Sequence, residues 1–279
     1  MLGLVSMGFQ ALITIQRALV MFGLAASLAG CATSGSNKVA MSASSSAMIP
    51  VAQKYAVHGV DVSRYQGQID WREARKAGTR FAFIKATEGG DHADENFALH
   101  WMMTKDAGVP RGAYHFYYWC RPVQDQIKWF FEHVPVERDA LPPVLDVEWY
   151  GAASEKCPHK VPRERALKAM KTFLTAAEKH YGKKPIIYTT IDFYRDVIDG
   201  DLHDYPLWVR TVNAEPHERY GDRRWAMWQY TDQGRVPGIK GNVDRNVFAG
   251  DETAWRQFAG PAFVPHAPAS NAVAMNEVK

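Results

Sequence analysis

Short apolar runs alternate with amphipathic stretches along most of the chain between residues 57 and 250. Apolar runs bounded by Gly, Pro, Asp or Asn predict strands, and apolar residues spaced three and four apart predict helices. Strands are predicted at residues 57–65, 81–88, 112–118, 143–148, 185–189, 207–210, 226–230 and 242–248. Helices are predicted at residues 70–78, 94–107, 124–134 and 163–181, with a short one near 193–198.

This order of strands and helices predicts the fold class. Repeated strand–helix units imply a parallel sheet, and eight strands in one domain indicate a closed barrel. The last third of the domain has little helix between its strands, so we expect an irregular barrel there. The expected fold is therefore α/β, an irregular TIM-like (β/α) barrel with one domain over residues 57–261. In such barrels functional residues lie at the carboxyl ends of the strands.

The most informative predicted strand lies within residues 141–150, LPPVLDVEWY. Asp146 and Glu148 stand two residues apart, so their side chains point to the same face with Cα atoms about 6.5–7 Å apart. Two carboxyls that close cannot both ionise freely, and apolar burial beside Trp149 also disfavours the ionised form of Glu148, so we expect Glu148 to have a raised pKa and Asp146 to stay anionic. One proton donor beside one anion is what glycoside hydrolysis requires. The alternative is a pair of solvated acids where a strand meets a loop.

Other acids follow the predicted strands in the same way. Asp61 and Glu88 lie at the ends of the first two strands, and Asp244 stands on the last one. Carboxyl ends of parallel strands meet at one end of a barrel. We therefore expect these acids, with Asp146 and Glu148, to line one pole of the domain.

The N-terminal segment, residues 1–31, is unlike the rest of the chain. Arg17 is followed by an apolar run at residues 18–30 that is too short to span a bilayer comfortably, and this combination is typical of a signal peptide. The run ends in LAGC at residues 28–31, which resembles the bacterial lipobox, where the cysteine is lipid-modified and becomes the mature N-terminus. We expect residues 1–31 to be a lipoprotein signal peptide with Cys31 as the lipidation site. An uncleaved membrane anchor is the alternative.

The segments that flank the predicted domain differ from it in composition. Residues 32–56 are rich in Ser and Ala without periodicity, which predicts a flexible tether, and residues 262–279 predict a disordered tail. The net charge of the 279-residue chain is only +3, and no basic run is long enough to indicate nucleic-acid binding.

Two cysteines remain beside Cys31, namely Cys120 and Cys157. Each follows a predicted strand end, so both are expected on loops at the same pole. In an oxidising compartment we expect such a pair to form a disulfide. Two cysteines are too few for a structural zinc site, and we expect no metal.

A series of motifs resembles the glycoside hydrolase family 25 muramidases, the Chalaropsis-type lysozymes. The motifs are GVDVS at 59–63 with YQG at 65–67, FIKATEG at 83–89, GAYHF at 112–116, VLDVE at 144–148, IYT at 187–189, WQY at 228–230 and VDRN at 243–246. Two positions depart from the family pattern, which leaves the glycan preference open. His92 stands near where an aromatic residue usually follows the TEG turn, and Arg210 lies on the sixth strand.

This resemblance implies hydrolysis of the β-1,4 bond between N-acetylmuramic acid and N-acetylglucosamine in peptidoglycan, with no cofactor. It makes Glu148 the general acid and Asp146 its anionic partner, either as nucleophile or by steering the substrate's own N-acetyl oxygen. Asp61 and Asp244 would tune this pair and bind substrate. The candidate substrate-binding residues are Glu88, Tyr117, Trp149, Tyr188 and Gln229.

Two of the aromatic positions have a structural interpretation beside the functional one. Trp149 either stacks on a sugar ring or packs in the core, and His115 is interpreted as a buried barrel histidine rather than a cleft residue. Two other functions also stay open: a non-catalytic wall-binding lipoprotein on the same scaffold, and a hydrolase of another N-acetylated glycan.

The expected partners are peptidoglycan glycan strands and, through lipid on Cys31, a membrane, with the chain as a monomer. Ala32 resembles the residue that permits sorting to an outer membrane. We therefore expect a protein of the cell envelope that faces the periplasm, at the outer membrane of a Gram-negative bacterium.

Overall fold

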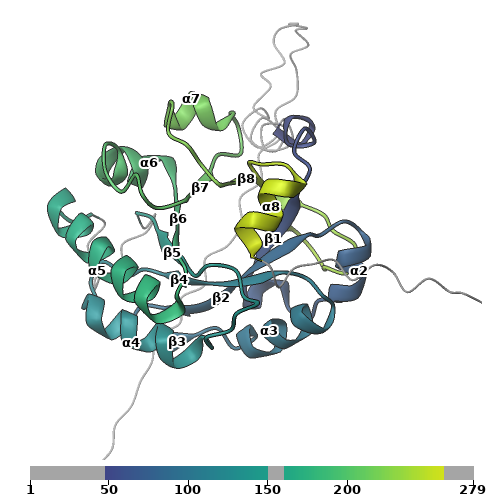
Figure 1. The fold of residues 1–279 in the computed structure, drawn as a ribbon, viewed down its shortest axis with the longest axis horizontal. Helices are drawn as coiled ribbons and strands as arrows, with labels where there is room; N and C mark the ends of the chain where they lie inside the picture. Colours follow the sequence, from purple (N-terminus) through teal and green to yellow (C-terminus); the bar gives the residue numbers. More distant parts are fainter. Residues whose placement is uncertain (1–47, 150–159, 261–279) are drawn as a thin grey trace, which may run out of the picture. The chain divides into compact units, whose positions relative to one another are not determined.

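A computed structural model describes residues 48–149 and 160–260 of the chain. There, eight strands close into a barrel in the order β1-β2-β4-β5-β6-β7-β8-β9, with β9 paired back to β1 (Figure 1). The strands are β1 (His58–Val62), β2 (Phe81–Glu88), β4 (Arg111–Phe116), β5 (Val144–Val147), β6 (Ile186–Thr189), β7 (Leu207–Arg210), β8 (Met227–Gly234) and β9 (Val243–Phe248). A short strand, β3 (His92–Ala93), pairs with β2. The predicted single-domain α/β barrel is confirmed.

Helices cover the outside of the barrel unevenly (Figure 1). The longer ones are α3 (Phe97–Asp106), α4 (Val123–His133) and α5 (Arg163–Tyr181), and the shorter α2 (Trp71–Lys76) precedes them. After β6 come only short pieces: α6 (Ile191–Phe193), the π-helical η2 (Tyr194–Ile198), α7 (Pro216–Tyr220) and α8 (Glu252–Ala259). The expected irregularity of the last third is thus present. In the part of the chain that the structure covers, no helix is both long enough and apolar enough to cross a membrane.

The last strand, β9, runs antiparallel to both of its neighbours, so the prediction of a parallel sheet is wrong at this strand. Residues 235–242 connect β8 to β9, whereas a parallel crossover needs roughly a dozen residues or more. Positive φ angles at Gly238 (88°) and Gly241 (79°) let this short connection turn back on itself. The reversal places Asp244, near the start of β9, opposite Asp61 on β1.

The N-terminal boundary of the domain also differs from the prediction. Residues 48–52 are helical and Ala52 is fully buried, so the tether predicted over residues 32–56 ends earlier than residue 56. The Tyr55 ring lies 5.6 Å from the Trp225 ring and 6.1 Å from the Trp228 ring. This segment therefore packs on the barrel near β8. The predicted signal peptide, Cys31 and the predicted tail fall outside the residues that the structure describes.

The barrel interior is apolar on one side of the acids. Phe83 and Trp208 point inward and place their ring centroids 4.9 Å apart. Because strand side chains alternate, residues two positions further along also face inward, such as Lys85 after Phe83 and Asp146 after Val144. The apolar interior thus forms the floor of a polar pocket.

Candidate active site

Four predicted acids meet at one pole of the barrel. Asp61 lies on β1, Asp146 on β5, Glu148 just beyond the end of β5, and Asp244 near the start of β9. They line one cavity of about 220 Å³. The other lining residues are Ser63, Tyr65, Lys85, Tyr114, Phe116, Tyr188, Trp208 and Gln229.

Asp146 and Glu148 form the first acid pair. Burial raises the pKa of Asp146 well above its ordinary value, and the negative charge of Glu148 raises it further. Burial also raises the pKa of Glu148, while the positive charge of Arg210 opposes that shift. The expected rise in the pKa of Glu148 is therefore present, and the pair retains a proton at a pH where solvated carboxyls have lost theirs.

The raised pKa of Asp146 runs against the expectation that this carboxyl stays anionic. A hydrogen bond between the two carboxyls raises the pKa of Asp146 and lowers that of Glu148. The physical reason is burial: Asp146 is buried on β5, whereas Glu148 is only half-buried at the strand end. The less solvated carboxyl is the one that is harder to ionise.

Asp61 and Asp244 form a second acid pair across the β1–β9 register. Burial and the charge of Asp244 raise the pKa of Asp61 well above its ordinary value, and burial raises the pKa of Asp244 to about 6. The Asn246 side-chain amide donates to Asp61 Oδ2 at 2.7 Å, and Gln229 Nε2 donates to the same oxygen at 3.5 Å. Tyr188 Oη in turn donates to Gln229 Oε1 at 2.7 Å. This network fixes the orientation of Asp61.

Two cations near the acids are held by other carboxylates. Lys85 forms an ion pair with Glu88, and Tyr118 Oη donates to Glu88 Oε1 at 2.8 Å. Burial alone would raise the pKa of Glu88, but the hydrogen bonds from Lys85 and Tyr118 lower it below its ordinary value. Arg210 pairs through Nη2 with Asp232 Oδ2 at 3.0 Å. Glu88, a predicted substrate contact, therefore orients Lys85 and does not itself line the cavity.

The remaining predicted substrate contacts divide into two groups. Tyr188 and Gln229 line the cavity, as expected. Tyr117 is buried in the outer layer with its ring 4.6 Å from the Trp119 ring, so its prediction as a cleft contact is wrong. The Trp149 ring lies 4.6 Å from the Phe193 ring, which corresponds to the packing alternative for this residue.

The misplacement of Tyr117 follows from strand alternation. Tyr114 and Phe116 of β4 face the cavity, so the neighbouring odd-numbered residues face outward. His115 accordingly forms hydrogen bonds with Thr87 Oγ1 (2.7 Å) and Gln126 Oε1 (3.1 Å) outside the cavity. Burial lowers the pKa of His115 to about 4. The interpretation of His115 as a buried barrel histidine is confirmed. The two-residue alternation, counted from Asp146 across the register, could have identified Tyr114 and Phe116.

The predictions about cysteines and metals are tested only in part. Cys120 is disulfide-bonded. Cys157 falls outside the described residues, so its pairing with Cys120 stays a prediction. Within residues 48–149 and 160–260 no group of three or more His, Cys, Asp or Glu side chains is arranged to hold a metal ion.

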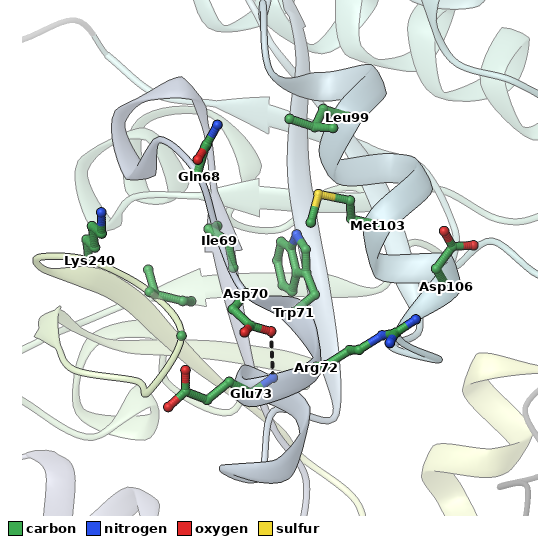
Figure 2. Close-up of a pocket in the computed structure, with 12 residues that line it drawn as sticks. Gln68, Ile69, Asp70, Trp71, Arg72, Glu73, Leu99, Met103, Asp106 and Lys240 are labelled. Carbon is green, nitrogen blue, oxygen red and sulfur yellow. Dashed lines mark hydrogen bonds between the residues drawn. The ribbon is translucent and has the colours of Figure 1, made fainter.

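A larger cavity of about 840 Å³ lies between α2, α3 and the β8–β9 connection (Figure 2). Its Asp70 carboxylate accepts a hydrogen bond from the Glu73 backbone N–H at 3.0 Å and thereby caps α2. The Trp71 indole is almost wholly buried and donates to His100 Nδ1 at 3.2 Å. These polar groups serve the fold, so the chemistry belongs to the smaller, acid-lined cavity.

Known proteins resemble this chain over most of the barrel. Residues 60–239 match the model of the family described as Glycosyl hydrolases family 25. The uncharacterized protein YegX of Escherichia coli O157:H7 is 38% identical over 218 residues, which cover 75% of this chain and 76% of that protein. Lysozyme M1 of Streptomyces globisporus is 32% identical over 209 residues, covering 70% and 68%. The structure of a family 25 glycosyl hydrolase from Bacillus anthracis aligns with a TM-score of 0.69 and 37% identity, covering 74% of this chain and 95% of that one.

Proposed function

This chain belongs to glycosyl hydrolase family 25, the lysozymes and muramidases that hydrolyse peptidoglycan, and we propose that it cleaves the β-1,4 bond between N-acetylmuramic acid and N-acetylglucosamine. The observation that carries this proposal is the pair formed by Asp146 and Glu148, two carboxyls at the end of β5 that line one cavity and whose pKa values are both raised. Such a pair supplies both the acid and the anion that glycoside hydrolysis needs.

Glu148 is the proposed proton donor. It is half-buried and lines the cavity just beyond the carboxyl end of β5. Because burial raises its pKa, Glu148 can hold a proton closer to neutral pH than a solvated glutamate does. It gives that proton to the glycosidic oxygen as the bond breaks.

Asp146 is the proposed anion, so its pKa, which burial raises in the free protein, must fall when substrate binds. Positive charge develops on the sugar ring in the transition state and favours an ionised carboxylate beneath it. The proton then resides on Glu148, from which it is transferred. Asp146 acts either as nucleophile or by steering the substrate's N-acetyl oxygen, and both routes require a negative charge at this position.

Substitution of each acid by its amide tests these roles. Glu148→Gln keeps the side-chain size but removes the transferable proton, so we expect the rate on peptidoglycan to fall about 10²–10⁴-fold. Asp146→Asn should be similarly inactive. Arg138→Gln changes an exposed residue on the loop before β5 and is the matched control, expected to keep the wild-type rate. A folded Glu148→Gln variant with near-normal turnover would contradict the assignment of the donor.

Mass spectrometry of the digested peptidoglycan tests the bond. Cleavage as proposed releases fragments with N-acetylmuramic acid at the reducing end. Fragments that end in reducing N-acetylglucosamine would show that the other glycosidic bond is cut. An absence of any new reducing ends with the wild-type protein would favour a wall-binding role.

We further propose that Cys31 is lipid-modified and holds the enzyme at the outer membrane, facing the periplasm. The support is the sequence LAGC at residues 28–31 behind an apolar run. Cys31→Ala should release the enzyme into the soluble fraction or leave the precursor uncleaved. Unchanged membrane fractionation of this variant would contradict the lipid anchor.

A further inference from the structure

Tyr65 lies at the mouth of the acid-lined cavity and is the most exposed large apolar side chain in the described part of the chain. It lines the cavity and is nevertheless 77% exposed. The helical turn η1 (Arg64–Gln66) presents it, and this turn is capped by Ser63, whose N–H donates to Gln66 Oε1 at 2.9 Å. An aromatic ring held in water beside a sugar-binding cavity is available to a ligand, because it contributes little to the core.

Arg64 is fixed beside this ring. Its guanidinium carbon lies 5.1 Å from the Tyr65 ring centroid, and Nη2 donates to Tyr65 Oη at 3.3 Å. Nη1 donates to His92 Nε2 at 2.9 Å, while the Arg64 backbone N–H donates to Asp94 Oδ2 at 2.8 Å. The side-chain partners of Arg64 are thus groups that orient the guanidinium without neutralising it.

The charges around the cavity distinguish Arg64 from the other cations there. Lys85 is paired with Glu88, and Arg210 is paired with Asp232. Arg64 forms no ion pair with any residue that the structure describes. Since four acids line the cavity, it repels an anionic substrate, and a cation without an ion pair beside Tyr65 offsets that repulsion.

We propose that Arg64 and Tyr65 form a recognition site for a carboxylate carried by the muramoyl part of the substrate, with the ring against the sugar and the guanidinium on the carboxylate. This inference rests on the proposed muramidase function and names the substrate feature that the site selects. Peptidoglycan offers the carboxylate in two places. One is the stem peptide, and the other is the lactyl group wherever no peptide is attached to it.

Steady-state kinetics with three substrates test this proposal. The substrates are peptide-bearing peptidoglycan, amidase-stripped glycan with free lactyl carboxylates, and the same stripped glycan with its carboxylates converted to neutral methylamides. Arg64→Gln keeps a hydrogen-bond donor and removes the charge. We expect it to lower kcat/KM about 5- to 20-fold on a carboxylate-bearing substrate, mainly through KM, and to leave the neutral glycan unaffected. The control Arg138→Gln should match the wild type on all three, and high salt should reduce the Arg64 effect.

The pattern of losses identifies the carboxylate. A loss confined to peptide-bearing peptidoglycan supports recognition of the stem peptide, and a loss on the stripped glycan with free carboxylates supports recognition of the lactyl group. An equal loss on the neutral glycan, or no loss on either charged substrate, overturns the proposal. Failure of the muramidase function itself would appear differently, as inactivity of the wild type and of Arg138→Gln on every glycan.

Discussion

Asp244→Asn removes a charge from the crowded pole of the barrel and is expected to stabilise the fold at neutral pH. Burial, followed by the negative charge of Asp232, raises the pKa of Asp244 from 3.8 to about 6. Each pKa unit corresponds to about 1.4 kcal/mol, so ionising this buried carboxyl lowers the free energy of unfolding by roughly 3 kcal/mol at most.

The sign of the effect follows from proton linkage. The pKa of Asp244 is higher in the folded than in the unfolded state, so the folded protein retains a proton that the unfolded chain releases. This stabilising contribution is complete below the unfolded pKa and is lost as the pH rises through about 6. Asparagine has the size of the protonated acid and does not titrate. The free energy of unfolding of the variant should therefore match that of the wild type at about pH 4 and exceed it by about 1–3 kcal/mol at about pH 7.5.

The lower part of that range reflects the neighbouring acid. The hydrogen bond from Asp61 favours the ionised Asp244 carboxylate and lowers its pKa, and an asparagine amide is a weaker acceptor for that bond, which reduces the gain. Urea unfolding followed by tryptophan fluorescence, repeated from about pH 4 to pH 8, measures the difference in the free energy of unfolding. Asp222→Asn changes an exposed aspartate and is the matched control. Stability profiles of Asp244→Asn and wild type that stay parallel across this range would refute the reasoning.

Two further substitutions follow from single contacts. Arg210→Met removes the charge that lowers the pKa of Glu148, so the alkaline limb of the pH–rate profile should move to higher pH; an unmoved limb would count against this coupling. Gly112→Ala would place a Cβ 2.5 Å from Phe83 Cε1 inside the barrel, and chemical denaturation should show a loss of about 1–3 kcal/mol. A Gly112→Ala variant as stable as the wild type would show that the interior relaxes around the methyl group.

Much of the barrel could be predicted because its local patterns agree with its tertiary structure. Apolar runs with clear boundaries predicted the strands, and three- and four-residue spacing predicted helices such as residues 163–181, which form α5. The direction of β9 could not be predicted in this way. The hydrophobic pattern of a strand does not indicate its direction. Only the connection at residues 235–242 indicates a hairpin, because it is too short for a parallel crossover.

The site was predicted less completely than the fold. The acids could be identified because polar residues at strand ends interrupt apolar runs, but their protonation depends on burial, which for Asp146 is almost complete. The choice of Tyr117 over Phe116 was an error of strand alternation by one residue, which reverses the face. Tyr65 lies in the YQG motif at residues 65–67, but nothing in the sequence indicates how Arg64 and Tyr65 lie relative to the acids. The exposure of Tyr65 beside the cavity and the contact between Tyr65 and Arg64 are tertiary properties.

The second acid pair, Asp61 and Asp244, influences the pKa of Glu148 in the first pair. The proton that Asp61 holds is shared with Asp244 through a hydrogen bond between their carboxyls, so this pair adds less than two full negative charges to the cavity. The charge that remains on Asp244 raises the pKa of Glu148, whereas the charge of Arg210 lowers it. The pKa of the proposed donor is thus set by burial together with two opposing charges on β9 and β7. Both charges act on Glu148 across the same cavity. Removal of the Asp244 charge should therefore lower the pKa of Glu148, and removal of the Arg210 charge should raise it, while the shape of the barrel is unchanged.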